Sequence, residues 1–475
     1  MSKDIEAIRT FDSQVKIPNE LLQFLRQDTY SLLINGNAGT GKTTLALSIL
    51  RILNINKNCL YISTRISPEQ LFQYYPWIKE FFDQTKQIED IETSTTEVSH
   101  PIFVDGRLDE PSSLFERITN ELMDVRAPII VIDTWDAIGF LMDKEALANN
   151  AKVLQTWRER AGAKIIFVTE NPEDKTFDFL VDGIIELRQK YYNERRVREI
   201  FLSKLHGVRI NRPSYIFSVN NNLFHSYDHY SPSEFFKSVH FSSVEGADTN
   251  LFKNKSHFTT GYHELDKMLG GGFPVRSAVN IELFPHVNAK IAFALLSKII
   301  ANFIASQNSL LFQPFEKTGH DMIMQYQKSF NHKKELINVI TERQSKKLKD
   351  DEDSNISQLR QVRQLVQKIK KKHPKKMLLS IICPDTGRST SKTIPDTDNL
   401  EVLSFIKANS DLSVFISRRM PDNRHTQVSE ISDMRFSILD LDGTVFLQSE
   451  TPWSQLYAIV TQSDKLDGVQ LEPIV

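Results

Sequence analysis

Cysteine is scarce in this chain of 475 residues, which has two, Cys59 and Cys383. They lie far apart in apolar contexts, so we expect neither a disulfide scaffold nor a cysteine-based metal site, and a reducing cytoplasm fits. The twelve histidines show no metal-ligand spacing, and surface or packing roles are expected for His225, His229 and His240.

Long apolar runs and a charge excess are also missing. No run approaches the ~18 residues that a membrane span needs, and residues 1–18 lack the apolar core of a signal peptide. The formal net charge is −2 at pH 7, so no global charge directs the chain to nucleic acid or to a membrane. With 40% hydrophobic and 25% charged residues, we expect an intracellular soluble protein of two or three domains.

Residues 30–50 carry the motif on which the interpretation of the rest of the sequence depends. The apolar segment Ser31–Asn35 leads into the glycine-rich run GNAGTGKT (Gly36–Thr43), and a helix-period pattern begins at Thr44. This strand–turn–helix context is what a G-x-x-x-x-G-K-[ST] motif requires. Glycines let backbone N–H groups surround a polyphosphate, and the helix directs its positive end at the anion. The predicted nucleotide-binding residues are Gly36, Asn37, Ala38, Gly39, Thr40, Gly41, Lys42, Thr43 and Thr44, with Thr43 a ligand of Mg²⁺.

Strands and helices alternate after this motif. The predicted strands are Cys59–Ser63, Ile102–Val104, Ala127–Ile132 and Lys164–Thr169, and the predicted helices are 67–82, Pro111–Val125 and Ala146–Ala161, with a polar loop at 83–100. Such alternation predicts a parallel sheet with helices on both faces. Gly183–Lys190 and Arg196–Leu205 read as a hairpin added to the sheet, followed by a strand at Tyr215–Val219. We expect this first domain to cover residues 1–220.

A second domain is expected at 257–475, after a connector at 221–256. Its predicted elements are strand Ala278–Phe284, helix Ala289–Ile304, strand Ser309–Phe312, a charged helical insertion at about 332–373, strands Met377–Cys383 and Leu412–Ile416, and a closing hairpin at Phe436–Val460. The order of elements repeats that of the first domain. The sequence therefore predicts an α/β protein built by a diverged internal duplication.

Two positions at strand ends complete the expected site. Asp133 ends an apolar strand some ninety residues after Lys42, where a Walker B carboxylate would hold the Mg²⁺. Thr169 and Glu170 end the next strand, at the edge of the sheet where ligands bind in open α/β folds. They are candidates for sensing the γ-phosphate.

Further phrases carry a resemblance to a known family. They are Tyr61–Leu71 (YISTRISPEQL), Asp182–Leu187 (DGIIEL), Lys204–Gly207 (KLHG) and, in the second half, Thr260–Pro274. With the P-loop and Asp133 they resemble the KaiC-like branch of the RecA superfamily, over residues 18–220 and, in eroded form, 257–475. They are similar in particular to archaeal two-domain KaiC-like proteins, including the gas-vesicle regulator GvpD. The resemblance implies two tandem RecA-like domains, ATP at subunit boundaries, often a hexamer, and a role in signalling or regulation.

The departures from this family concern catalysis. Members have a Glu-Glu pair at the position of Arg65-Ile66, and a glutamate there activates the attacking water. Arginine cannot serve as that base because a guanidinium stays protonated in proteins, so we expect Arg65 to contact the γ-phosphate, unless it is a solvated surface residue. In the family's Lys-x-Arg-Gly motif, Lys204 is retained, but His206 stands at the position of the arginine. Arg209 or Arg212 would have to supply the missing guanidinium. No catalytic residue is established, and Glu170, Lys204 and Arg65 are the candidates.

The second domain departs further. At its P-loop position, Phe284–Ile291 (FPHVNAKI), the lysine survives as Lys290, but side chains stand at all three glycine positions and isoleucine replaces the Mg²⁺ hydroxyl. We expect a degenerate domain that binds no nucleotide. Between Arg343 and Lys376, twelve Lys and Arg stand against four Asp and Glu. This basic helical region is either a solvated face or a surface for an acidic partner or nucleic acid.

Three functions fit these observations. The first is a cytoplasmic regulator that binds Mg·ATP in the first domain, hydrolyses it slowly or not at all, and acts through a homo-oligomer or a partner protein. The second is a DNA-dependent ATPase of the recombinase type. The third is a structural scaffold with a vestigial P-loop.

Overall fold

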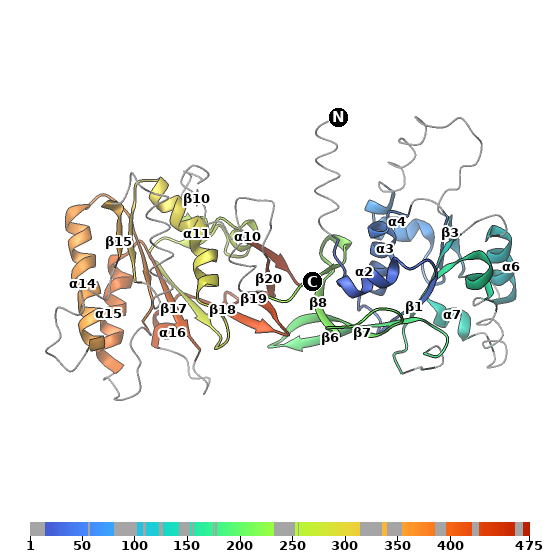
Figure 1. Cartoon of the computed structure of the whole chain (residues 1–475). Helices are drawn as coiled ribbons and strands as arrows, with labels where there is room; N and C mark the ends of the chain where they lie inside the picture. Colours follow the sequence, from blue (N-terminus) through green and yellow to red (C-terminus); the bar gives the residue numbers. More distant parts are fainter. Residues whose placement is uncertain are drawn as a thin grey trace. The chain divides into compact units, whose positions relative to one another are not determined.

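The structure is a computed structural model that describes residues 15–55, 58–79, 102–107, 111–122, 127–140, 156–173, 178–231, 252–254, 256–313, 335–339, 354–384, 396–419, 427–460 and 469–475, with Met142, Val153 and Lys175. The chain divides into two compact units. Unit 1 comprises Met1–Asp228 together with Ile474–Val475, and unit 2 comprises His229–Pro473. Each unit is described separately below (Figure 1).

Unit 1 is built on a nine-stranded sheet whose order is β3-β2-β4-β5-β1-β6-β7-β8-β9. The five strands at the β3 end of this order and β6 are parallel, and β6 to β9 continue as antiparallel neighbours. The strands are β1 Tyr30–Gly36, β2 Cys59–Ser63, β3 Ile102–Asp105, β4 Ile129–Asp133, β5 Lys164–Thr169, β6 Gly183–Tyr192, β7 Arg195–Leu205, β8 Ser214–Ser218 and β9 His225–Ser226. A short 3₁₀ turn, Asn220–Asn222, joins the last two.

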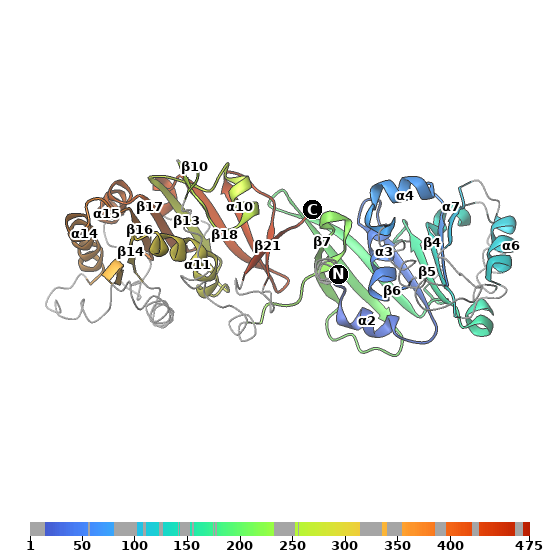
Figure 2. The same ribbon diagram turned by 90° about the horizontal axis from the view of Figure 1, so that it is seen from above.

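Helices cover both faces of this sheet. On one face α2 (Asn19–Leu25) and α3 (Lys42–Ile52) pack with the side chains of alternate strand residues such as Leu32 and Val131. On the other face α6 (Pro111–Leu122) and α7 (Trp135–Gly139) pack with Leu33, Ile130 and their neighbours. Alternate residues of one strand therefore enter two different cores, as expected when both faces are buried. Figure 2 shows α3 lying along its face of the sheet.

The elements predicted for this region agree with the structure at their centres. β2 and β5 have the predicted bounds, and the hairpin after Asp182 is present as β6 and β7. The predicted helix start at Ser67 is present as α4 (Pro68–Tyr74), where Ser67 and Gln70 form a capping box. The predicted helix 67–82 is interrupted after Tyr74, because helical residues resume only at 77–79, and its last three residues lie outside the described part of the chain. The polar loop at 83–100 and most of the helix at 146–161 lie outside the described residues.

Unit 2 contains a second nine-stranded sheet, ordered β15-β14-β16-β17-β13-β18-β19-β20-β21. Its strands are β13 Ser277–Leu283, β14 Ser309–Phe312, β15 Ile337–Val339, β16 Leu378–Ile382, β17 Leu412–Arg418, β18 Met434–Leu441, β19 Thr444–Thr451, β20 Tyr457–Val460 and β21 Gln470–Pro473. A small antiparallel sheet precedes it, formed by β10 Phe252–Asn254, β11 His257–Phe258 and β12 Phe273–Pro274. Short helix α10 (His263–Met268) lies between β11 and β12 in the chain.

The two large sheets have the same strand order when the strands of each sheet are numbered in chain order. A shared polar detail supports the duplication. In unit 1, Asp182 before β6 accepts a hydrogen bond from the Ser31 N–H of β1 at 2.9 Å. In unit 2, Asp433 before β18 accepts one from the Ala278 N–H of β13 at 2.8 Å. The prediction of two tandem RecA-like α/β domains is confirmed by these sheets.

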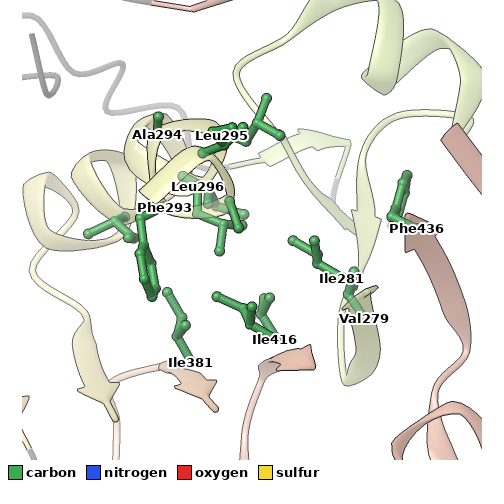
Figure 3. Close-up of a cluster of buried hydrophobic side chains, with 14 of the residues drawn as sticks. Val279, Ile281, Phe293, Ala294, Leu295, Leu296, Ile381, Ile416 and Phe436 are labelled. Carbon is green, nitrogen blue, oxygen red and sulfur yellow. The ribbon is translucent and has the colours of Figure 1, made fainter. Parts of the chain in front are cut away.

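The core of unit 2 also has two layers. Helix α11 (Lys290–Ala305) packs on one face of the sheet, with Phe293 and Leu296 against strand residues such as Ile381 and Ile416 (Figure 3). Helices α14 (Ser354–Lys372) and α15 (Asp396–Asn409), with α16 (Gln427–Ile431), pack on the other face. The predicted helical insertion at about 332–373 is wrong at Ile337–Val339, which pair with β14 as a sheet strand. Among the described residues, no helix combines the length and apolarity that crossing a bilayer requires.

Candidate functional site

The glycine-rich loop of unit 1 joins the end of β1 to the start of α3. Gly36 has a φ of +154° and Gly41 a φ of +103°, a region that side-chain-bearing residues rarely adopt. A Cβ on Gly36 would also lie 2.4 Å from the Leu187 carbonyl oxygen of β6. The loop therefore approaches the neighbouring strand so closely that only glycine fits at this position.

Lys42, the first residue of α3, is folded onto this loop. Its side chain is 5% exposed, and Nζ donates a hydrogen bond to the Asn37 carbonyl oxygen at 2.9 Å. Glu170 Oε1 lies 3.9 Å from the same nitrogen. Burial lowers the pKa of the Lys42 ammonium, against the opposing effect of Glu170 and Asp133. The ammonium thus stands within the loop, at the place that a phosphate-binding lysine requires.

Thr43 and Asp133 are in direct contact, as the pairing of these motifs predicts. The Thr43 hydroxyl donates to Asp133 Oδ2 at 2.7 Å. A second donor, the Tyr61 hydroxyl, contacts the same oxygen at 2.6 Å. Burial raises the pKa of Asp133, although the hydrogen bonds from Tyr61 and Thr43 act in the opposite direction. Sequence reasoning missed Tyr61, because it lies inside a strand that reads as core.

The side chains at this site fit a nucleotide bound together with Mg²⁺. A hydroxyl and a carboxylate are hard oxygen ligands of the kind that Mg²⁺ prefers. Asn35 Oδ1 and Thr169 Oγ1 are buried at the ends of β1 and β5, where these two residues are register partners, and both atoms lack a hydrogen-bond partner among the described residues. Buried polar atoms of this kind are normally satisfied by water or a ligand. The glycine-rich loop, the hydroxyl and carboxylate of Thr43 and Asp133, and the two unsatisfied atoms all lie where the parallel strands end, at one edge of the sheet.

Arg65 pairs with Glu170 across this edge. The Arg65 guanidinium donates to Glu170 Oε1, and about half of the arginine side chain, 53%, is exposed. The Glu170 N–H in turn donates to Asp136 Oδ2 at 2.6 Å. Asp136, in the first turn of α7, is a site residue that sequence reasoning missed, and burial raises its pKa. The structure thus brings together two of the three catalytic candidates in one ion pair.

Arg198 is a further residue that the sequence did not single out. It lies on β7, is 5% exposed, and its Nη1 donates to the Gly39 carbonyl oxygen of the loop at 2.8 Å. Its Nε donates to the carbonyl oxygen of Val475 at 2.5 Å. Burial lowers the pKa of this guanidinium. Arg198 therefore supports the glycine-rich loop from the hairpin side.

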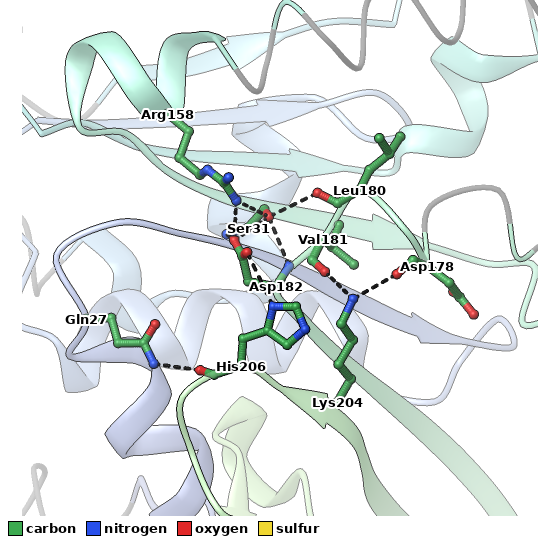
Figure 4. A network of polar contacts seen from close by, with 9 residues as sticks. All are labelled: Gln27, Ser31, Arg158, Asp178, Leu180, Val181, Asp182, Lys204 and His206. Atoms are coloured by element: carbon green, nitrogen blue, oxygen red, sulfur yellow. Dashed lines mark hydrogen bonds and ion pairs between the residues drawn. The ribbon is translucent and has the colours of Figure 1, made fainter.

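Lys204, the third catalytic candidate, lies elsewhere. Its Nζ donates to the carbonyl oxygens of Asp178 at 2.9 Å and Val181 at 2.7 Å (Figure 4). These contacts lie at the start of β6, beside the beginning of β1, whereas the loop follows the end of β1. Five residues of strand, about 17 Å, separate Ser31 from Gly36. Within one chain, Lys204 and Lys42 are therefore not brought together.

The same network includes His206 and Asp182. His206 Nδ1 lies 3.7 Å from Asp182 Oδ1, and its ring is 63% exposed. Asp182 Oδ2 accepts hydrogen bonds from the Ser31 hydroxyl at 2.8 Å and from Arg158. Burial raises the pKa of Asp182, but these hydrogen bonds outweigh it and the pKa is lowered overall.

Asp182→Asn is expected to destabilise unit 1 in a pH-dependent way. A carboxyl whose pKa is lower in the folded state stabilises the fold above its unfolded pKa, about 4, and this stabilisation is lost as the pH falls through the folded value. The free energy of unfolding at pH 7 should fall by about 1–3 kcal/mol, and the difference from wild type should shrink at pH 3.5. Urea unfolding at both pH values measures it. Asp178→Asn is the control, since Lys204 contacts only the main-chain carbonyl of that residue. An equal difference at the two pH values would contradict the role of the carboxylate.

The corresponding loop of unit 2 has a different construction. Val287 and Ala289, at two of the glycine positions, are 3% and 6% exposed and belong to the hydrophobic core, as does Ile291 at the position of Thr43. The loop amides are engaged locally, with the Val287 N–H donating to the Phe284 carbonyl and the Lys290 N–H to Asn288 Oδ1. The loop is filled by its own side chains. Asp385-Thr386, which echo Asp133-Thr134 in sequence, lie outside the described residues.

The basic helical region is packed on one side. In α14, Val362, Val366 and Ile369 are buried in the core of unit 2, while Lys368, Lys371 and Lys372 are exposed. Arg363 pairs with Glu401 and Lys370 with Asp411. The described part of this region is thus an amphipathic helix with a solvated basic face.

Comparisons with known proteins agree with this site. Residues 21–203 match the family described as GvpD gas vesicle protein, P-loop domain. Protein GvpD1 of Halobacterium salinarum is 28% identical over 63% of this chain and 56% of its own length, and Protein GvpD2 of the same organism is 22% identical over 96% of each. The circadian clock oscillator protein KaiC of Thermostichus vulcanus is 24% identical over 51% of this chain and 45% of its own length. The match thus spans little more than half of GvpD1 and less than half of KaiC. The chain is therefore similar to the GvpD P-loop family over residues 21–203 and, over about half of its length, to KaiC.

Proposed function

We propose that this protein is a regulator that binds Mg·ATP at the P-loop of unit 1 and hydrolyses it slowly or not at all. One observation carries the proposal. Thr43 and Asp133, the proposed Mg²⁺ ligands, are in contact, and Arg65 pairs with Glu170 at the same edge of the sheet. The groups proposed to bind the phosphates and the metal lie together, and Glu170, the carboxylate beside Lys42, is paired with the Arg65 guanidinium.

Each binding group has a defined role in the proposal. The loop amides and Lys42 would hold the β- and γ-phosphates, and Thr43 and Asp133 would hold the Mg²⁺. When bound, the cation neutralises charge on the phosphate oxygens. ATP is chosen over other nucleotides from the family relation alone.

Slow hydrolysis follows from the charges at the sheet edge. Arg65 stands where a water-activating glutamate would, and a guanidinium does not accept a proton near neutral pH. Glu170 is the nearest carboxylate, but it faces the Arg65 guanidinium and lies 3.9 Å from the Lys42 ammonium. Both cations lie against the same oxygen, Oε1, so this carboxylate is engaged by cationic partners rather than presented to a water molecule.

The remaining parts of the proposal concern partners. We propose that unit 2 is a scaffold without a nucleotide site, since Val287, Ala289 and Ile291, at two glycine positions and the hydroxyl position of the motif, are buried in its hydrophobic core. The exposed position of His206 and the distance of Lys204 from its own loop favour contacts with a second copy of the chain, in a hexamer or another ring, or with a regulatory protein. The buried thiols of Cys59 and Cys383 suit the cytoplasm, and the Halobacterium relatives suggest an archaeal regulator.

The test is to measure ATP binding and ATP turnover together on the full chain, with and without single-stranded DNA. We expect micromolar or tighter binding of Mg·ATP, turnover below about 1 s⁻¹, the lower end of typical enzymes, and no response to DNA. Turnover that rises with DNA would favour the recombinase-type ATPase, for which the basic face of α14 is the supporting feature. Absence of any nucleotide binding would favour the scaffold with a vestigial P-loop.

A further inference from the structure

The carboxylate that the site offers to a metal is held by two hydroxyls on one oxygen. Asp133 Oδ2 accepts from Thr43 at 2.7 Å and from Tyr61 at 2.6 Å. The first donor belongs to the P-loop motif. The second comes from the middle of β2, where no motif requires a polar group, and its ring is 1% exposed.

Strand register explains how this hydroxyl reaches the site. β2 and β4 are parallel neighbours in which Ser63 stands beside Asp133 and Tyr61 beside Val131. Tyr61 therefore lies two residues before the partner of Asp133, on the same face of the sheet, because alternate strand residues share a face. Such diagonal neighbours are within reach of an aromatic side chain. A shorter polar residue at this position would not span the separation.

The ring and the hydroxyl of Tyr61 have separable roles. The ring packs in the core of unit 1 and lies 5.5 Å from the Phe103 ring, measured between centroids. A phenylalanine would keep this packing and lose only the hydrogen bond. The hydroxyl, in contrast, makes its hydrogen bond to the Asp133 carboxylate.

We propose that Tyr61 is a positioning residue for divalent-cation binding, which holds the Asp133 carboxylate against Thr43 so that hydroxyl and carboxylate are presented to Mg²⁺ together. The inference rests on the proposed nucleotide site. It adds that the Mg²⁺ dependence of nucleotide binding is set from β2, outside the two motifs. Without the Tyr61 hydroxyl, Asp133 has one donor fewer and its carboxylate is free to rotate away from Thr43.

A neighbouring tyrosine provides a matched control. The Tyr75 hydroxyl lies 3.0 Å from the Thr44 hydroxyl, one residue beyond Thr43. Tyr75→Phe therefore removes a phenolic hydroxyl that contacts the first turn of α3, from the residue that follows α4, without removing a donor to Asp133. Asp133→Asn serves as the reference for loss of the metal-binding carboxylate.

The experiment is a titration of a fluorescent ATP analogue into the full chain, in EDTA and then at increasing Mg²⁺. For Tyr61→Phe we expect an unchanged affinity in EDTA and a Mg²⁺ half-saturation raised about tenfold, as the loss of one hydrogen bond to a charged group implies. Tyr75→Phe should match wild type in both, and Asp133→Asn should lose the Mg²⁺ response.

Each outcome decides between the possibilities. An unchanged Mg²⁺ half-saturation in Tyr61→Phe overturns the inference. A variant that fails to fold, or whose affinity falls equally with and without Mg²⁺, shows a merely structural tyrosine and overturns it as well. If wild type binds no analogue in either condition, the proposed function itself fails. This outcome differs from failure of the inference alone, in which wild type and Tyr61→Phe both bind the analogue with the same Mg²⁺ dependence.

Discussion

Lys42→Ala is expected to remove most of the stabilisation that Mg·ATP confers on unit 1. A ligand at ~100 times its Kd stabilises a protein by about 2.7 kcal/mol through mass action. Lys42 is the buried cation of the loop, so its loss removes the direct charge that a triphosphate would meet. The nucleotide-free protein should change little, because the lost partner, the Asn37 carbonyl, belongs to an exposed residue. Thermal unfolding with and without saturating Mg·ATP measures the effect.

The duplication supplies a control for this variant. Lys290 begins α11 as Lys42 begins α3, yet the loop before it is filled by core side chains. Lys290→Ala should therefore keep the full nucleotide-dependent shift. A shift lost in Lys290→Ala but kept in Lys42→Ala would place the nucleotide in unit 2 and contradict the assignment. Loss in both variants would mean that the two loops are coupled.

Much of unit 1 could be predicted from local patterns. The glycine-rich run, the apolar strands ending at Asp133 and Thr169, and the Ser67-Pro68 helix start each depend on a few consecutive residues. Their meeting at one edge follows from the rule that parallel strands share their carboxyl ends. The Thr43–Asp133 contact was foreseeable for this reason, although the two residues are ninety positions apart in the chain.

The contacts that define the chemistry were not foreseeable in the same way. The contact of Arg65 with a phosphate stays a prediction, and the pairing that the structure does show, with Glu170, joins two loop residues and is encoded by no pattern. Tyr61 reads as an apolar strand residue, and only the register of β2 against β4 shows that its hydroxyl reaches Asp133. Side-chain pairs between strands depend on register, which the sequence of one strand does not specify.

In unit 2 the misses have a different cause. β15 is three residues long and lies in a polar, charged stretch, too short for a strand pattern to stand out. α15, for which no helix was predicted, begins in the polar run Asp396–Asn399 and gains its place by packing on α14 and β17. Tertiary contacts decide such elements more than their own propensity does.

Arg65→Glu is expected to raise ATP turnover at least tenfold over wild type. The substitution removes the cation that neutralises Glu170 and places a second carboxylate beside it. A glutamate at position 65 can accept a proton from the attacking water, which arginine cannot. A positioned general base contributes about 10²–10⁴-fold to catalysis by proton transfer. Single-turnover and steady-state phosphate release, with ATP affinity measured in parallel, test the expectation.

Two further variants identify which carboxylate acts. Arg65→Ala releases Glu170 without adding a base at position 65, so any gain there belongs to Glu170. The double variant Arg65→Glu/Glu170→Gln keeps the new carboxylate alone, and retention of the gain would assign the base to position 65. Because Glu170 also lies 3.9 Å from Lys42, Glu170→Gln alone should alter ATP affinity more than turnover. Rapid hydrolysis by wild type, abolished by Glu170→Gln, would instead show that the Arg65–Glu170 pair opens when ATP binds, and the slow-hydrolysis proposal would then be wrong.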